Sequence, residues 1–168
     1  MIIFDFDQTL VDTSPVEHLR AKRDWKGVMN RVDGLRVYPG IDRLLADIHA
    51  RGHTLAIVTK SPDMVVKAFI RKYAWPIDIV VGYHDVTKRK PDPEGLLLAI
   101  KRGRASAAVT VHVGDQAQDT EAARSAKVTA IGVTWGIADT RDLEASKPDE
   151  LFAEVVQLEA YLARLALP

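Results

Sequence analysis

Short apolar runs alternate with helix-like segments along the chain, and this alternation limits the possible folds more than any other feature. Five runs are rich in Val and Ile and are too short to be typical helices. These predicted strands cover residues 1–6, 54–59, 77–82, 109–114 and 128–135. Because the runs are continuously apolar rather than alternating, we expect both faces of the sheet that they form to be buried.

The segments between the runs carry apolar residues at helical spacing. Predicted helices cover residues 41–51, 62–73, 93–102 and 119–126, and a last amphipathic helix runs from residue 149 to about residue 165. Strands that alternate with helices favour right-handed crossovers, which place helices on both faces of a parallel sheet. The sequence therefore predicts a three-layer α/β fold with a mostly parallel five-stranded sheet, in a single domain over residues 1–168.

The composition is ordinary for a globular protein and excludes several classes of function. Of the 168 residues, 47% are apolar and 27% are charged, and 23 basic side chains balance 23 acidic ones, so neither nucleic acid nor membrane is indicated as a partner. The absence of cysteine excludes disulfides, thiolate metal sites and a cysteine nucleophile. We recognise no signal peptide and no apolar run of ~20 residues, so we expect a cytoplasmic protein.

Polar side chains stand where the predicted strands end. In parallel α/β sheets the carboxyl ends of the strands lie at one edge, and ligands bind there. The candidates at this edge are Asp5, Asp7, Thr59, Lys60, Ser61, Lys88, Arg89, Lys90, Asp115 and Asp119. Separate segments of the chain therefore bring acids, hydroxyls and cations toward one site.

The acids and the cations suit different parts of one reaction. Asp5, Asp7 and Asp115 offer hard oxygen ligands, and without Cys or a matched His pair such a cluster favours Mg²⁺ over zinc. Thr59 and Lys90 suit a phosphate dianion. A carboxylate can attack phosphorus to form an aspartyl phosphate, while a second acid protonates the leaving alcohol and later activates water.

Four motifs at these positions resemble, in content and in order, those of the haloacid dehalogenase-like (HAD) hydrolase superfamily. They are DFDQT at 5–9, TKS at 59–61, KRKPDP at 88–93 and GDQAQD at 114–119. The chain is most similar to the phosphoglycolate phosphatase-type branch. The resemblance implies a Rossmann-like (HAD-like) fold and a magnesium-dependent phosphomonoester hydrolase that acts through an aspartyl-phosphate intermediate.

The resemblance also implies roles for the four acids. Asp5 is the implied nucleophile and metal ligand, and Asp7 is the general acid/base whose backbone carbonyl also binds the metal. Asp115 would complete the Mg²⁺ site, and Asp119 would support it without binding the ion directly. The presence of Asp7 favours phosphotransfer over dehalogenation, because the dehalogenases of the family lack this second acid and need no metal.

The resemblance assigns the phosphoryl group to the hydroxyl and the cations. Thr59, Lys60 and Lys90 would bind it, and Lys90 is preferred over Lys88 and Arg89 because it stands immediately before a proline. Taken alone, each motif also has a structural explanation, as a turn, a helix cap or a solvated charge. The presence of all four motifs in the order of the family favours an enzyme over these structural explanations. A phosphomutase-type phosphotransferase and a non-catalytic phosphate-sensing or scaffold protein stay as alternatives.

The segments between the motifs are too short for a full cap domain. Residues 13–38 offer only a short insert in its place, so we expect an open site. Such a site admits a bulky phosphorylated substrate or takes a lid from another subunit, so an oligomer is also compatible with the sequence. The basic stretch 18–31 has no assigned role, and neither has His84, whereas His112 is expected in the core. Gln8 stands where the family usually has Gly and is expected to alter only the turn.

Overall fold

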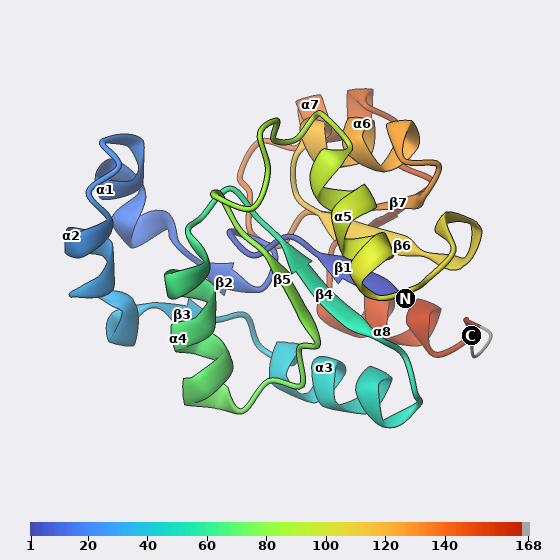
Figure 1. The fold of residues 1–168 in the computed structure, drawn as a ribbon, viewed down its shortest axis with the longest axis horizontal. Coiled ribbons are helices and arrows are strands. Elements are labelled where there is room, and N and C mark those ends of the chain that lie inside the picture. Colours follow the sequence, from blue (N-terminus) through green and yellow to red (C-terminus); the bar gives the residue numbers. More distant parts are fainter. Residues whose placement is uncertain (166–168) are drawn as a thin grey trace.

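Six parallel strands form the central sheet of the computed structural model, which describes residues 1–165 (Figure 1). The strands are β1 (Ile2–Phe4), β4 (Leu55–Val58), β5 (Ile79–Val81), β6 (Val111–Gly114), β7 (Thr129–Val133) and β8 (Glu150–Phe152). Their order across the sheet is β5-β4-β1-β6-β7-β8, and every neighbouring pair is parallel. The predicted α/β fold with a mostly parallel sheet is confirmed, with one strand more than expected.

The additional strand lies where the sequence predicts the start of the last helix. Residues 150–152 form β8 and pair with β7, and the helix α8 begins only at Val155 (Val155–Leu162). The side chains of Glu154 and Gln157 form a capping box that fixes this start. The predicted boundary at residue 149 is therefore wrong, because the open edge of β7 offers backbone partners that helical spacing does not reveal.

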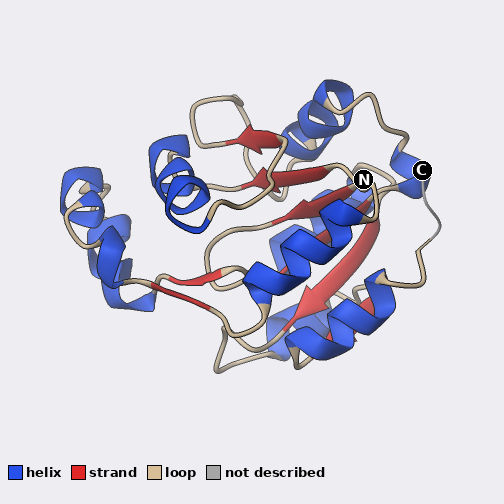
Figure 2. Ribbon diagram, turned by 90° about the horizontal axis from the view of Figure 1, so that it is seen from below, coloured by secondary structure: helices blue, strands red, loops and turns tan. Residues whose placement is uncertain are grey.

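Two helical layers enclose the sheet, as Figure 2 shows. Helices α3 (Ile41–Ala50), α4 (Asp63–Tyr73) and α8 cover one face. Helices α5 (Glu94–Arg102) and α6 (Ala117–Ser125) cover the other, and α7 (Arg141–Ala145) packs against α6. The three-layer arrangement expected from the sequence is therefore present.

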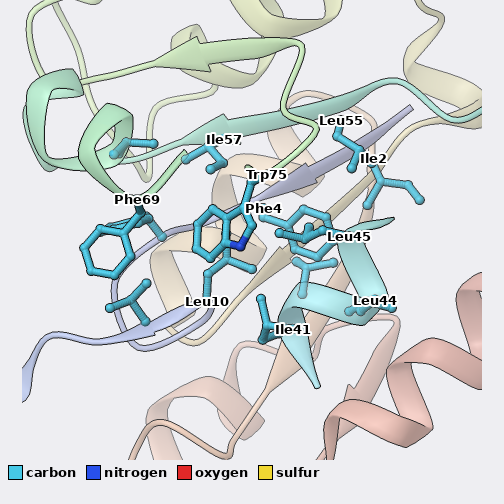
Figure 3. Close-up of a cluster of buried hydrophobic side chains, with 14 of the residues drawn as sticks. Ile2, Phe4, Leu10, Ile41, Leu44, Leu45, Leu55, Ile57, Phe69 and Trp75 are labelled. Atoms are coloured by element: carbon cyan, nitrogen blue, oxygen red, sulfur yellow. The ribbon is translucent and has the colours of Figure 1, made fainter. Parts of the chain in front are cut away.

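Alternate residues of the inner strands point to opposite helical layers. Ile2 and Phe4 join Leu55 and Ile57 in the cluster under α3 and α4 (Figure 3). Ile3 packs on the other side, toward α5 and α6. This alternation explains why the strands are apolar without interruption. Burying each of these side chains contributes about 1.5–3 kcal/mol, so the inner strands are rigid supports for whatever follows them.

The segment between β1 and α3 projects to one side of the sheet (Figure 1, blue). It contains a two-stranded antiparallel ribbon, β2 (Val11–Asp12) and β3 (Arg36–Val37), and two short helices, α1 (Glu17–Ala21) and α2 (Trp25–Met29). Turns of 3₁₀ helix lie in this segment at Ser14–Val16 and Val32–Gly34. A third such turn lies outside it, at Ala107–Val109, just before β6. Val16 and Val28 are buried in the main cluster, which anchors the projecting segment to the core.

No helix of the described part of the chain is long and apolar enough to cross a bilayer.

Candidate active site

The polar residues that follow the three inner strands lie together because these strands are neighbours. β1 pairs with β4 on one side and with β6 on the other. Asp5 and Asp7 follow β1, Thr59 follows β4 and Asp115 follows β6. All four side chains are buried, so the site lies at the carboxyl edge of the sheet and mostly out of bulk water.

Lys90 reaches the centre of this edge from the loop between β5 and α5. Its Nζ lies 2.8 Å from Asp5 Oδ1 and 2.6 Å from Asp119 Oδ1, and it donates a hydrogen bond of 3.1 Å to the Val58 carbonyl. The lysine is only 7% exposed. A single buried ammonium group therefore joins two carboxylates that come from different elements.

The neighbouring cations of the same loop do not reach the carboxylates. Lys88 is exposed and lies 3.8 Å from Asp92, and the Arg89 guanidinium lies 3.7 Å from the centroid of the Tyr83 ring. Lys60, which was predicted to bind phosphate, lines the same small pocket as Lys90, and its amine donates to Gln118. The structure thus places Lys60 and Lys90 at the site and the other two cations outside it.

Asp7 is held by a different set of partners. Its Oδ2 accepts hydrogen bonds from Thr59 Oγ1 at 3.2 Å and from Ser61 Oγ at 2.9 Å. The same oxygen lies 2.8 Å from Nη2 of Arg20, which comes from α1. Its Oδ1 is buried and has no hydrogen-bond partner within residues 1–165. Asp7 therefore stands between the sheet and the projecting segment.

Three carboxylates gather closely enough to hold one metal ion. Oxygens of Asp5, Asp115 and Asp119 lie within 4.8 Å of one another. Asp115 Oδ1 accepts a hydrogen bond of 3.1 Å from Thr9, and its Oδ2 is buried without a partner among the described residues. A buried carboxylate oxygen that lacks a donor fits a hard cation such as Mg²⁺.

Both carboxylate oxygens of Asp119 already have partners within the protein. Its Oδ1 lies 2.6 Å from Lys90 Nζ and 3.3 Å from His112 Nε2, and its Oδ2 accepts a hydrogen bond of 3.0 Å from the Gln116 backbone. The other ring nitrogen of His112 faces the Ile3 carbonyl, so this histidine is a buried, partnered side chain, as expected. Asp119 is therefore placed to orient Lys90 rather than to surround an ion.

Burial and neighbouring charges shift the pKa values of these groups strongly. Burial, with the carboxylates around them, raises the pKa of Asp5 to about 7 and that of Asp115 to about 8. Burial would also raise the pKa of Asp119, but the Lys90 ammonium and the His112 ring hold it below its usual range. The pKa of Lys90 is raised, because Asp119 and Asp5 outweigh its burial. Ionisation of Asp5 and Asp115 is therefore unfavourable unless a further cation is bound beside them.

Comparison with known proteins places this geometry in a family. A family model described as haloacid dehalogenase-like hydrolase matches residues 14–133. The chain belongs to this family.

Individual relatives agree with the assignment. A protein of Dickeya dadantii named "Probable phosphatase IndB" is 39% identical over 144 residues, which cover 83% of this chain and 62% of that protein. The phosphoglycolate phosphatase of Escherichia coli K12 is 30% identical over 141 residues, covering 81% and 54%. This chain therefore spans about half to three fifths of the length of these relatives. The solved structure of a hydrolase from Pseudomonas syringae has the same fold, with a TM-score of 0.80, 22% identity and 98% coverage of both chains.

The position where this HAD-like chain departs from its family is accommodated by the fold. Gln8 adopts the left-handed backbone conformation with φ of 59°, which glycine adopts at little cost. Its Oε1 accepts a hydrogen bond of 2.8 Å from the Tyr38 hydroxyl. The side chain that strains the turn therefore also ties it to the end of the projecting segment.

Sequence reasoning assigned no contact with the acids to Thr9, Ser61 or Arg20. Thr9 and Ser61 lie inside the DFDQT and TKS motifs, so the motifs themselves contained the signal. Arg20 lies in the basic stretch 18–31, but nothing in its local sequence distinguishes it from Arg23 or Lys22. Only the path of α1 brings its guanidinium to Asp7. His84 is exposed, and its ring meets Tyr83 edge-on.

Proposed function

We propose that this chain is a magnesium-dependent phosphatase that hydrolyses phosphomonoesters through an aspartyl phosphate on Asp5. The observation that carries the proposal is the buried group of Asp5, Asp115 and Asp119, in which Lys90 is the only lysine or arginine within ion-pair distance among the described residues. Such a group calls for a divalent cation, and the bound cation together with Lys90 would in turn attract an anionic phosphoryl group. The family and the phosphatase names of its relatives support the same chemistry.

The residues fit magnesium as the metal. Asp5 and Asp115 would hold it with their carboxylates and Asp7 with its backbone carbonyl, while Asp119 would stay bound to Lys90. Bound Mg²⁺ would neutralise charge on the substrate phosphate and on Asp5. The unpartnered Oδ2 of Asp115 supports this assignment, because a buried carboxylate oxygen without a donor is costly unless a cation faces it.

Asp5 and Asp7 would divide the reaction into two steps. In the first step an oxygen of Asp5 attacks phosphorus, the bond from phosphorus to the ester oxygen breaks, and Asp7 gives a proton to that oxygen. In the second step Asp7 takes a proton from water, the water oxygen attacks phosphorus, and the bond to Asp5 breaks to release phosphate. Thr59, Lys60 and Lys90 would bind the phosphoryl oxygens during both steps.

The projecting segment bears on the choice of substrate. We propose that residues 13–38 take the place of a full cap, so that the site accepts a phosphorylated substrate of some bulk or takes a lid from a second subunit. Its two main helices are only five residues long each, α1 and α2, which supports a minimal covering.

The test is phosphate release by the purified chain with Mg²⁺, from an aryl phosphate and from a panel of phosphorylated metabolites, nucleotides and phosphopeptides. We expect turnover that Asp5→Asn abolishes and that Asp33→Asn, at an exposed acid of the projecting segment, leaves unchanged. A phosphoryl group on Asp5 should be detectable by mass spectrometry after rapid acid quenching. Absence of turnover across the whole panel would favour the scaffold alternative instead.

A further inference from the structure

Trp135 belongs to none of the four motifs, yet its side chain is bonded to the first of them. Its indole Nε1 donates a hydrogen bond of 3.0 Å to the backbone carbonyl of Thr9. Thr9 is fully buried, and its Oγ1 in turn donates a hydrogen bond of 3.1 Å to Asp115 Oδ1. Two hydrogen bonds in succession therefore lead from the indole to a carboxylate of the proposed metal site.

The order of the strands explains how residues so far apart in the chain meet. In the sheet, β6 lies between β1 and β7 (Figure 1). Asp115 follows β6, whereas Thr9 lies in the turn after β1 and Trp135 follows β7. Thr9 and Trp135 therefore join across the end of the strand that carries Asp115.

The loop that carries Trp135 is fixed on both sides. The Thr134 backbone N–H donates a hydrogen bond of 3.0 Å to the Phe152 carbonyl in β8. A Cβ at Gly136 would collide with the carbonyl of Gln8, so the loop packs directly against the turn after β1. The ring of Trp135 also packs, partly buried, against the main hydrophobic cluster. The indole donor thus projects from a loop with little freedom to move.

The hydrogen bond from Thr9 distinguishes the two oxygens of Asp115. Oδ1 accepts this bond, and Oδ2 is buried without a partner among residues 1–165. A carboxylate fixed through one oxygen presents the other in a defined direction. Groups that orient a metal ligand in this way matter for binding, and their loss typically weakens metal affinity by about 10- to 100-fold.

We propose that Trp135 is a positioning residue for the metal site. It holds the Thr9 carbonyl, so that the Thr9 hydroxyl keeps Oδ1 of Asp115 in place and leaves Oδ2 free for the cation. The inference rests on the proposed function, because it uses Asp115 as a ligand of Mg²⁺. Trp135 acts through Thr9 and makes no bond to the ion itself.

The test measures Mg²⁺ binding to the full chain without substrate. Thermal unfolding over a series of Mg²⁺ concentrations gives an apparent dissociation constant from the rise in Tm. Thr9→Val removes the hydroxyl and keeps the shape of the side chain, so we expect Mg²⁺ to bind about 10- to 100-fold more weakly. Thr9→Ser keeps the hydroxyl and should restore most of the affinity.

Trp135→Phe removes the N–H donor and keeps an aromatic ring. We expect Mg²⁺ to bind about 3- to 10-fold more weakly, which corresponds to the loss of one neutral hydrogen bond. In a Thr9→Val background the same change should have almost no further effect, because the hydroxyl through which Trp135 acts is already absent. A purely structural role of Trp135 would lower the Tm without Mg²⁺ and leave the dissociation constant unchanged.

Trp75→Phe is the matched control. Its Nε1 donates a hydrogen bond of 2.6 Å to Asp42 Oδ1 in α3, so this variant also loses an indole bond, but to a residue outside the candidate site. We expect a lower Tm without Mg²⁺ and the wild-type dissociation constant. Trp135→Tyr, which also lacks the indole donor, carries the test if Trp135→Phe does not fold.

The outcomes separate this inference from the proposed function. Wild-type Mg²⁺ affinity in Trp135→Phe, or a loss that adds in full to that of Thr9→Val, overturns the role of Trp135 and leaves the phosphatase standing. If Mg²⁺ does not raise the Tm of the wild-type chain, the metal assignment of the proposed function fails, and this inference fails with it.

Discussion

Lys90 and Arg20 each place a cation against a carboxylate of the site, but the protein holds them in different ways. The Lys90 side chain is 5% exposed, comes from the loop after β5 and pairs with two buried acids. The Arg20 side chain is 17% exposed, comes from a five-residue helix of the projecting segment and shares its charge with the exposed Glu17. Lys90 is therefore held more tightly than Arg20, because it is more deeply buried and both of its acidic partners are buried.

The largest effect is expected when the ammonium group of Lys90 is removed. Lys90→Met leaves Asp5 and Asp119 buried without their cation, so we expect a loss of about 3–5 kcal/mol in the free energy of unfolding and a fall of about 10²- to 10³-fold in activity. Urea denaturation and phosphate release measure the two effects. Lys88→Met, at an exposed lysine of the same loop, is the control. A stability loss as large in Arg20→Gln would erase the contrast between the two cations.

The stability of the metal-free protein should fall as the pH rises. Asp5 and Asp115 have folded pKa values of about 7 and about 8, raised from an ordinary 3.8. Folding therefore favours their protonated forms, and this contribution is complete below about pH 4 and is lost as the pH rises through 7 and 8. We expect a loss on the order of 1–4 kcal/mol between pH 5 and pH 9 with EDTA.

Magnesium should remove this loss, because it compensates the ionised carboxylates. Thermal unfolding at each pH with Mg²⁺ and with EDTA measures the difference, which should widen as the pH rises. In Asp115→Asn the difference between Mg²⁺ and EDTA should grow less as the pH rises. A gap between the two conditions that stays constant with pH would show that these acids do not bind the ion.

The packing behind Asp119 gives a smaller effect. A Cβ at Gly114 would collide with the Asp119 carboxylate, so Gly114→Ala must displace the group that orients Lys90. We expect destabilisation of about 1–3 kcal/mol together with reduced activity. Gly34→Ala, where a Cβ meets no atom within 4 Å, serves as the control for stability. Wild-type activity in Gly114→Ala would mean that the orientation of Lys90 does not depend on Asp119.

The smallest effect is expected at the turn that links the two regions. Gln8→Gly relieves a left-handed residue, worth roughly 1–2 kcal/mol, but it loses the bond from Tyr38 and gives more freedom to the unfolded chain. The net change in unfolding free energy should stay within about 1 kcal/mol. Tyr38→Phe, which removes the bond alone, should destabilise by about 0.5–1.5 kcal/mol. A larger change in either variant would show that the turn controls how the projecting segment is attached.

Much of the fold and of the candidate site could be predicted from local patterns. Continuous apolar runs identified five of the six strands of the central sheet, because a strand buried on both faces must be apolar at every position. The acids and the cations at the strand ends were recognised because parallel strands bring their carboxyl ends to one edge. Asp5, Asp7, Thr59, Lys90 and Asp115 do lie together there, and the catalytic roles predicted for them stay predictions.

The elements that escaped prediction are short or depend on distant partners. β2, β3 and β8 have two or three residues each, too few to show a period, and each exists because another strand is available to pair with it. The side-chain carboxylates that gather are those of Asp5, Asp115 and Asp119, and the metal role predicted for the backbone carbonyl of Asp7 stays a prediction. The side chain of Asp7 is held by two hydroxyls and by Arg20, which the sequence did not reveal.

Local sequence patterns were enough to predict the layered fold, the edge of the sheet where the candidate site lies and the family to which the chain belongs. These properties follow from apolar periodicity and from motifs within a few residues of a strand end. The pairing of Asp119 with Lys90, the contacts of Asp7 with Thr59 and Ser61, and the approach of Arg20 to the site depend on tertiary packing. Contacts between residues far apart in the chain depend on how helices and loops pack in three dimensions, and local sequence patterns do not record that packing.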